Sequence, residues 1–188
     1  MKSIAKLIFE IGTLKRMKRA WLKNEGVSNP ESVADHIYRT AVIGYLVAKM
    51  ERADADKVMK MCLFHDIAEV RIGDIDKIAQ RYIEKDEVEM KILEDQLKNL
   101  PFSVGEEAMD AVKEMSQKIT KEAIIAKDAD ILELLFQAKE YADIGHTGCL
   151  YWIEKNSRFL KTESAKNIFA ELSSMNSTDW WKGLENLK

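Results

Sequence analysis

The sequence predicts an all-α protein, and three observations carry that prediction. Apolar residues recur with the period of a helix along most of the 188 residues. Eight glycines and two prolines are too few for the many turns of a β architecture. Ala, Leu, Met, Glu and Lys, which favour helices, are abundant. Because a chain of this length buries one sizeable core, we expect residues 1–188 to form a single-domain helical bundle.

The N-terminal half is predicted to contain three helices. An apolar stripe predicts the first helix over about residues 2–15. The polar stretch KNEGVSNP ends that pattern, and Pro30 suits the first turn of a second helix that runs to about Met50. Asp54 or Asp56 can cap a third helix, which carries KVMKMCLFHDIAEV and ends at residues 73–74.

The middle of the chain is predicted to hold a solvated helix and a buried one. A charged helix is expected over about residues 75–99, largely facing solvent. Pro101 interrupts, and a further helix is expected over about 104–117. Thr120 with Glu122 opens the strongly apolar segment EAIIAKDADILELLFQAKEYADIG. We expect this last helix to lie in the centre of the bundle.

Two short helices and a tail complete the prediction. Gly145 and Gly148 bracket a loop before helices over about 150–159 and 163–172. The tail has little periodicity, and we expect Trp180 and Trp181 to dock it onto the body.

Composition excludes some classes of function. The net charge of −3 is spread over the chain without a basic stripe, which argues against a nucleic-acid-binding surface but permits a small anionic substrate. The N-terminal apolar run is too short for a membrane span and lacks a signal-peptide cleavage site. Cys62 and Cys149 lie in unrelated settings, so we interpret them as buried thiols of a cytoplasmic protein, with a disulfide as the minor alternative.

Ionisable residues interrupt the apolar pattern of CLFHDIAEVRIGDI. Cys62, His65, Asp66 and Glu69 follow the spacing i, i+3, i+4 and i+7, which places them on one face of a helix. Apolar neighbours surround them, and burying an unpaired carboxylate costs several kcal/mol, so a partner is required. A divalent cation is the strongest partner available.

Further candidate ligands occur on two other predicted helices. His36 lies beside the apolar stripe of PESVADHIYRTAVIGYLVA, and Asp128 and Asp130 lie among aliphatic residues of the central helix. Taken alone, a histidine such as His36 is more often a hydrogen-bonded core residue. Two histidines and two aspartates together would suit Mn, Co, Fe, Zn or Mg.

The motifs ESVADH, HDIAEVRIGD and KDAD, in this order along the chain, resemble those of the HD-domain metal-dependent phosphohydrolases. Within them the chain looks most like the HD-domain 5'-nucleotidases that hydrolyse deoxyribonucleoside 5'-monophosphates. The resemblance runs from about residue 5 to 160. It implies an HD-domain helical bundle with a metal-site core over about 16–145, followed by C-terminal helices and a tail over 150–188.

The resemblance implies a set of metal ligands. His36, His65 and Asp66 match the first three ligands of the family, and Asp130, at the end of K-x-x-D, matches the fourth. Asp128 is about 200° away from Asp130 around a helix, so at most one of the two should reach the ion. Mn, Co or Mg is the expected cofactor, with Zn, Fe, Ni or Cu as further candidates.

The resemblance also implies catalytic carboxylates. Glu69 matches the catalytic glutamate, and Asp74 matches a carboxylate that acts in catalysis and helps bind the substrate. In some relatives Glu69, Asp74 and the main chain of Ile75 hold a second divalent ion, and the sequence leaves the number of ions open.

The segment LKRMKRAWL resembles the family's Arg-and-aromatic motif. By that match Arg19 grips the phosphate and Trp21 packs near the sugar or base. Arg16 is the alternative phosphate ligand, and Trp21 could equally cover the end of the bundle. After residues 73–74 some bacterial relatives carry prolines where this chain reads IDKIAQRY, so base and sugar selectivity stay open.

The expected partners are a nucleotide substrate and a second copy of the chain, with neither nucleic acid nor membrane. Apolar positions within YIEKDEVEMKILEDQLKN could form a subunit contact: Ile83, Met90, Leu93 and Leu97. Two alternatives remain at this point. One is an HD-type hydrolase acting on a nucleoside triphosphate or cyclic nucleotide, and the other is a non-catalytic helical interaction module.

Overall fold

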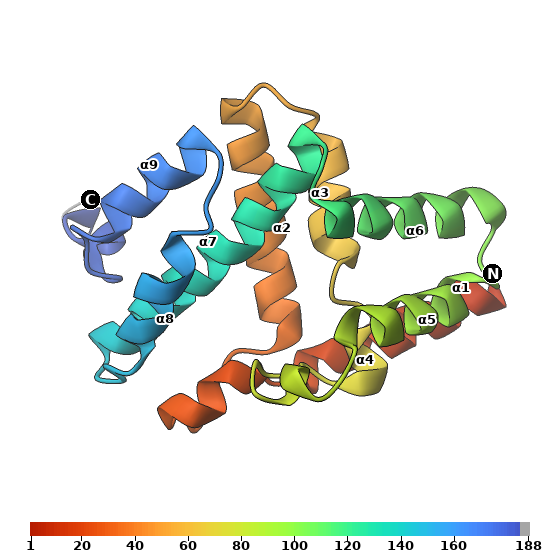
Figure 1. Ribbon diagram of the computed structural model, residues 1–188, viewed down its shortest axis with the longest axis horizontal. Helices are drawn as coiled ribbons and strands as arrows, with labels where there is room; N and C mark the ends of the chain where they lie inside the picture. The colour runs from red at the N-terminus through yellow and green to blue at the C-terminus, as the bar shows by residue number, and fades with distance from the viewer. Residues whose placement is uncertain (185–188) are drawn as a thin grey trace.

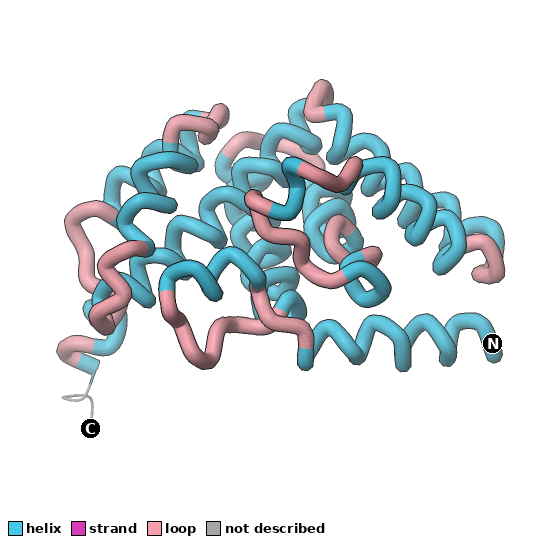
Figure 2. Tube along the Cα trace, turned by 60° about the horizontal axis from the view of Figure 1, so that its bottom comes forward, coloured by secondary structure: helices cyan, strands magenta, loops and turns pink. Residues whose placement is uncertain are grey.

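The computed structural model describes residues 1–184 as a bundle of α-helices, which confirms the predicted fold class (Figure 1). Within that range there are nine α-helices, four 3-10 helices and no strand, and one isolated antiparallel bridge pairs Lys18 with Ser32. Figure 2 shows the same helices joined by short loops and turns. No helix in residues 1–184 is long and apolar enough to cross a membrane.

Three helices form the centre of the molecule: α2 (Val33–Met50), α3 (Ala55–Phe64) and α7 (Lys121–Asp143). In Figure 1, α2 and α3 stand side by side and α7 crosses them. Gly44 permits the close approach of α2 to α3, because a Cβ there would lie 2.8 Å from the Sγ of Cys62. The prediction that 121–143 is the central helix is confirmed. The largest core cluster joins these helices through Val47, Val58, Met61, Ile125 and Leu132.

Side-chain caps determine where the central helices begin. Helix α2 begins at Val33, later than the predicted start at Pro30, because Ser32 and Asp35 form a reciprocal capping box. Asp54, one of the two predicted candidates, caps α3 by accepting a hydrogen bond from the amide of Lys57. Thr120 caps α7 as predicted.

The predicted third helix is interrupted at the candidate site. Helix α3 ends at Phe64, residues 65–68 form a turn, and the short helix α4 covers Glu69–Ile72. Within the turn, main-chain hydrogen bonds span three residues, such as the 3.1 Å bond from the Glu69 amide to the Asp66 carbonyl. The prediction that Cys62, His65, Asp66 and Glu69 share one face of a continuous helix is therefore wrong, because His65 and Asp66 lie on a bend between α3 and α4.

The charged segment 75–99 also differs from the prediction. Residues 75–84 are mostly loop around a 3-10 turn, Ala79–Arg81, and α5 covers only Lys85–Leu97. Asp76 accepts hydrogen bonds from the amides of residues 78 and 79, which favours a turn over a helix there. Helix α5 is not simply solvated: Leu93 and Leu97 are buried in this chain's own core and are unavailable for a subunit contact.

The remaining elements surround this centre. Helix α1 (Lys2–Ile11) and two 3-10 helices, Gly12–Arg16 and Ala20–Glu25, precede α2. Helix α6 (Phe102–Gln117) packs against α3 and α7. Helices α8 (Cys149–Ser157) and α9 (Glu163–Leu172) follow α7. Both cysteines are buried and free, as predicted.

The predicted docking of the tail by tryptophans is wrong: Trp180 and Trp181 are 73% and 44% exposed. A polar contact from the amide of Ser177 to Asp143 holds this segment instead.

Candidate metal centre and active site

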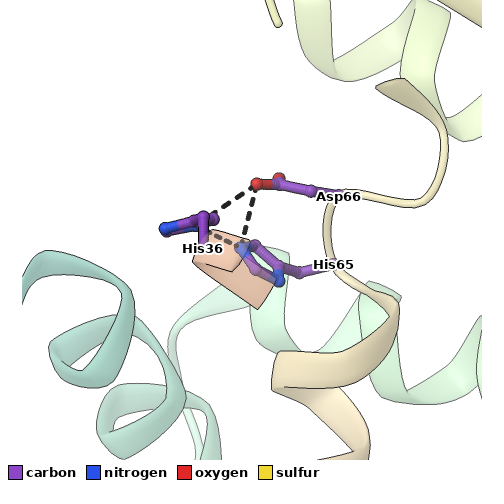
Figure 3. A group of neighbouring side chains, drawn as sticks. All are labelled: His36, His65 and Asp66. Carbon is purple, nitrogen blue, oxygen red and sulfur yellow. Dashed lines mark hydrogen bonds and ion pairs between the residues drawn. The ribbon is translucent and has the colours of Figure 1, made fainter. Parts of the chain in front are cut away.

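Three predicted ligands meet where the N-terminal end of α2 faces the bend after α3 (Figure 3). The Nε2 atoms of His36 and His65 are 3.3 Å apart. One carboxylate oxygen of Asp66 lies 3.1 Å from Nε2 of His65 and 3.5 Å from Nε2 of His36. His36 thus meets two consecutive residues, the first of them 29 positions further along the chain, and the three side chains point at one another.

Asp130 approaches the same cluster from the middle of α7. Its Oδ1 is 3.4 Å from Nε2 of His36, and its Oδ2 accepts a hydrogen bond from Lys127. Asp128 points elsewhere, because its buried carboxylate accepts hydrogen bonds from the main chain of Lys161 and Thr162 at the start of α9. The structure therefore brings Asp130, and not Asp128, to the two histidines.

The tautomers of both histidines suit a cation. Nδ1 of His65 lies 2.7 Å from the carbonyl oxygen of Cys62, which can only accept, so Nδ1 carries the proton. Nδ1 of His36 lies 2.5 Å from a carboxylate oxygen of Glu133, which again calls for a proton on Nδ1. Without an ion, burial and Arg19 lower the pKa of His36, but Glu133, Asp130 and Asp66 raise it more, so that it lies well above its ordinary value. With a bound cation the rings are neutral, and both Nε2 atoms then direct their lone pairs toward Asp66 and the ion. Metal-binding histidines in proteins have this arrangement.

The charges of the cluster favour a bound cation. Burial raises the pKa of Asp66, but the two histidines lower it more, and the net pKa lies well below its usual value. Burial also raises the pKa of Asp130, but Lys127 and the histidines lower it by more, so the pKa of Asp130 too lies well below its usual value. Both aspartates therefore stay ionised and available as metal ligands at neutral pH.

Arg19 is the cation beside this cluster. Its buried guanidinium lies 3.4 Å from Asp66 and 3.8 Å from Asp74. Two main-chain hydrogen bonds clasp its segment to the start of α2, one from the Arg19 amide to the Glu31 carbonyl (3.0 Å) and one from the Val33 amide to residue 17 (2.8 Å). Asp74 in turn accepts from the amide of residue 20 at 2.7 Å.

Arg16, the alternative phosphate ligand, lies apart from these groups. It is exposed, and its guanidinium contacts the hydroxyl of Thr13. Of the two arginines in the motif, only Arg19 is placed beside the cluster.

Glu69 is the most deeply buried carboxylate near the bend, at 1% exposure. One of its oxygens accepts a 3.2 Å hydrogen bond from Lys85, and the other has no hydrogen-bond partner within residues 1–184. Burial, followed by the charges of Asp66 and Asp74, raises the pKa of Glu69 to about 9. The raised pKa favours the protonated carboxyl, which is the form that can donate a proton.

Two other predicted site residues are engaged elsewhere. Trp21 is buried against Trp152 of α8, with ring centroids 5.2 Å apart, which favours the structural alternative for this residue. The main-chain carbonyl of Ile75 accepts a 2.6 Å hydrogen bond from Gln80. Glu69 contacts Lys85, and Asp74 accepts a hydrogen bond from the amide of residue 20, so each member of the predicted second-ion set already has a protein partner.

Sequence reasoning missed Glu133 and Arg39. Glu133 is fully buried between His36 and Arg39, and Arg39 also contacts Gln137 and Glu140. Burial raises the pKa of Glu133, but His36 and Arg39 lower it more, so its pKa falls below the usual value. The signal was present: Glu133 follows Asp130 by three residues in an apolar helix and so lies on the same face.

This geometry defines a class of helical proteins that bind a divalent metal ion through histidine and aspartate side chains. The model of the HD domain matches residues 11–172. This chain belongs to the HD-domain family.

Curated relatives and solved structures agree with this assignment. A Dictyostelium discoideum protein named 5'-deoxynucleotidase HDDC2 is 37% identical over 145 residues, covering 72% of this chain and 75% of that protein. The human protein of the same name is 33% identical over 148 residues, covering 77% and 71%. A conserved hypothetical protein from Pyrococcus furiosus has a TM-score of 0.75 and 35% identity, covering 91% of this chain and 99% of that one. The PH0347 protein from Pyrococcus horikoshii OT3 has a TM-score of 0.76 and 29% identity, covering 90% and 96%.

Proposed function

We propose that this protein is a metal-dependent phosphomonoesterase that hydrolyses deoxyribonucleoside or ribonucleoside 5'-monophosphates to a nucleoside and inorganic phosphate. The observation that carries the proposal is the meeting of two histidine Nε2 lone pairs with Asp66 and Asp130 beside a buried arginine. The names of the curated relatives, 5'-deoxynucleotidases from a slime mould and several vertebrates, support the substrate class.

In this proposal His36, His65, Asp66 and Asp130 hold the divalent ion. When bound, the ion supplies Lewis-acid polarisation of a phosphate oxygen and lowers the pKa of a water molecule. Mixed nitrogen and oxygen donors suit Mn, Co or Mg, and Zn, Fe, Ni or Cu are the further candidates. We propose one ion, because Lys85 already contacts Glu69 and Gln80 already contacts the carbonyl of Ile75.

Arg19 is proposed to bind the phosphate. A guanidinium can donate to two phosphate oxygens at once, and the clasp to α2 holds Arg19 beside the metal ligands before substrate arrives. Asp74 orients this segment through the amide of residue 20, and we propose that it also contacts the sugar. Trp21 packs on Trp152 and so holds the segment that carries Arg19, and it affects sugar or base binding only through the position of that segment.

Glu69 is proposed as the proton donor to the leaving 5'-oxygen. Its buried position keeps the carboxyl protonated, and the ammonium of Lys85 stabilises the carboxylate that forms after proton transfer. The acid can then recover its proton from water in the next cycle.

The experiment is phosphate release from all common nucleoside 5'-monophosphates, with Mn²⁺, Co²⁺ and Mg²⁺ tested separately. Orthophosphate from the monophosphates is the expected product. Pyrophosphate or triphosphate release from nucleoside triphosphates, or opening of a cyclic nucleotide, would favour the alternative HD-type hydrolase. A protein that takes up no divalent ion would favour the interaction module.

We further propose that the protein is a cytoplasmic homodimer with its metal-site core in residues 16–145. Buried free cysteines are typical of a reducing compartment. Helix α2 exposes a row of apolar side chains that a second copy could cover, at Tyr38, Val42 and Leu46. Light scattering after size-exclusion chromatography measures the oligomeric state directly.

A further inference from the structure

The two candidate histidine ligands are oriented by different kinds of acceptor. His65 donates from Nδ1 to a main-chain carbonyl, that of Cys62. His36 donates from Nδ1 to the side chain of Glu133, which has 0% exposure. The hydroxyl of Thr40 is 3.5 Å from the same nitrogen, too long to compete with the 2.5 Å contact. One ligand of the site therefore depends on a replaceable side chain.

Glu133 is itself held by a guanidinium. Arg39 donates to Oε1 of Glu133 from Nε at 3.0 Å and from Nη2 at 2.7 Å. This leaves Oε2 for His36. On its outer side Arg39 donates to Gln137 at 2.8 Å and to Glu140 at 2.7 Å. A continuous polar chain thus runs from the surface of α7 to the metal site.

We propose that Glu133 is a positioning residue that sets the metal affinity of this site, and that Arg39 sets which oxygen of Glu133 faces His36. By accepting the Nδ1 proton, Glu133 keeps the lone pair of His36 on Nε2, where it faces His65, Asp66 and Asp130. The inference rests on the metal site of the proposed function. It assigns to residues outside the ligand set the control of one ligand's tautomer.

A glutamine at position 133 would reverse that tautomer. An amide has one acceptor oxygen and one donor nitrogen, and two N–H groups of Arg39 face one side of the residue. The oxygen must therefore turn toward Arg39, and the NH₂ group must turn toward His36. Nδ1 of His36 would then accept a hydrogen bond, which moves the ring proton to Nε2 and removes the lone pair from the site.

Removing Arg39 as well should rescue the site. In the double variant Arg39→Met with Glu133→Gln, no guanidinium directs the amide. The glutamine oxygen can then turn back to accept from Nδ1 of His36, and Nε2 recovers its lone pair. A residue needed only for packing would give the opposite result, because a second substitution in the same buried contact would weaken the site further.

The test is the Kd of Mn²⁺, measured by isothermal titration calorimetry on the full chain. Glu133→Gln should raise Kd about 10–100-fold. The matched control is Glu140→Gln, which removes another carboxylate partner of Arg39 without touching His36 and should leave Kd within about twofold. The double variant should recover about tenfold of the lost affinity. Circular dichroism checks that each variant is folded.

Two outcomes would overturn the inference: wild-type affinity in Glu133→Gln, or a double variant that binds Mn²⁺ no better than Glu133→Gln. If Glu133→Gln does not fold, ¹⁵N chemical shifts of His36 in the metal-free wild type, recorded at a pH where the ring is neutral, decide, since without an ion on Nε2 the contact with Glu133 must keep the proton on Nδ1. A proton on Nε2 would refute the idea. Because the readout is metal binding, a wild type that binds Mn²⁺ but hydrolyses no nucleotide would refute only the proposed function.

Discussion

Replacing Asp128 by alanine should destabilise the protein without affecting its metal site. The carboxylate of Asp128 accepts hydrogen bonds from the amides of Lys161 and Thr162 at 3.0 Å and 2.7 Å, and from the Thr162 hydroxyl at 2.7 Å. These bonds anchor the start of α9 to α7, next to the buried side chain of Leu160. No other contact of Asp128 leads toward His36.

The magnitude follows from the two main-chain donors that lose their acceptor. An unsatisfied buried donor costs about 1–3 kcal/mol, and the lower part of that range applies because water can reach Lys161 and Thr162. The free energy of unfolding should therefore fall by about 2–3 kcal/mol. For a chain of this size that lowers Tm by about 4–12 °C.

The assay is thermal unfolding in EDTA, followed by circular dichroism, with Mn²⁺ binding measured on the same samples. Asp130→Ala is the matched control two residues away. It leaves the hydrogen bonds to Lys161 and Thr162 intact and should lose the Mn²⁺ binding that Asp128→Ala keeps. The reasoning is refuted if Asp128→Ala melts within about 2 °C of the wild type. A folded Asp128→Ala protein without Mn²⁺ binding would refute it equally.

Four further predictions test the site and the fold. Glu69→Gln should keep Mn²⁺ binding and lower kcat by about 100-fold or more, because an amide cannot donate the proton, and unchanged phosphate release would exclude this role. Arg19→Lys should lower kcat/KM about tenfold through loss of the two-pronged grip, whereas Arg16→Lys should match the wild type. Saturating Mn²⁺ at about 100 Kd should add about 2.7 kcal/mol of stability, visible as a Tm rise that EDTA abolishes; an unchanged Tm would contradict a metal site. The hydrogen bond from Arg71 lowers the pKa of Glu10. The contribution of this pair to the free energy of unfolding is therefore full above the ordinary glutamate pKa of about 4.3, and it is lost as the pH falls through the lower pKa of the folded state. Urea unfolding should therefore separate Arg71→Met from the wild type at neutral pH and bring them together in acid.

Much of the fold was predictable because local signals and tertiary structure agree. Thr120 begins α7 through a capping bond that depends only on neighbouring residues. The family motif K-x-x-D selected Asp130 over Asp128, and helical geometry added that at most one of the two could reach the ion. Asp54 could not be separated from Asp56 by sequence, since both residue types and positions suit a cap.

The failures have causes that the pattern of apolar residues does not reveal. No glycine or proline in CLFHDIAEV breaks the helix, yet the chain bends at His65. There Nδ1 of His65 donates a hydrogen bond to the carbonyl of Cys62, and the following main-chain amides donate to carbonyls three residues earlier instead of four. The pairing of Glu133 with Arg39 joins two helices, so its geometry is invisible in one sequence even though helical spacing pointed to Glu133. The exposure of Trp180 reflects polar anchoring of the tail, which composition does not reveal.

The clasp between residues 17–19 and 31–33 has a consequence for protein engineering. Because both ends of the intervening loop are fixed by main-chain hydrogen bonds, its length and composition can vary while the guanidinium of Arg19 and the imidazole of His36 keep their separation. The loop's anchors would have to be retained: the buried side chains of Trp21, Leu22 and Val27, and the carboxylate of Glu25, which accepts a hydrogen bond from Trp152. Loops transplanted between these fixed ends would therefore leave the cluster of His36, His65, Asp66 and Asp130 unaltered.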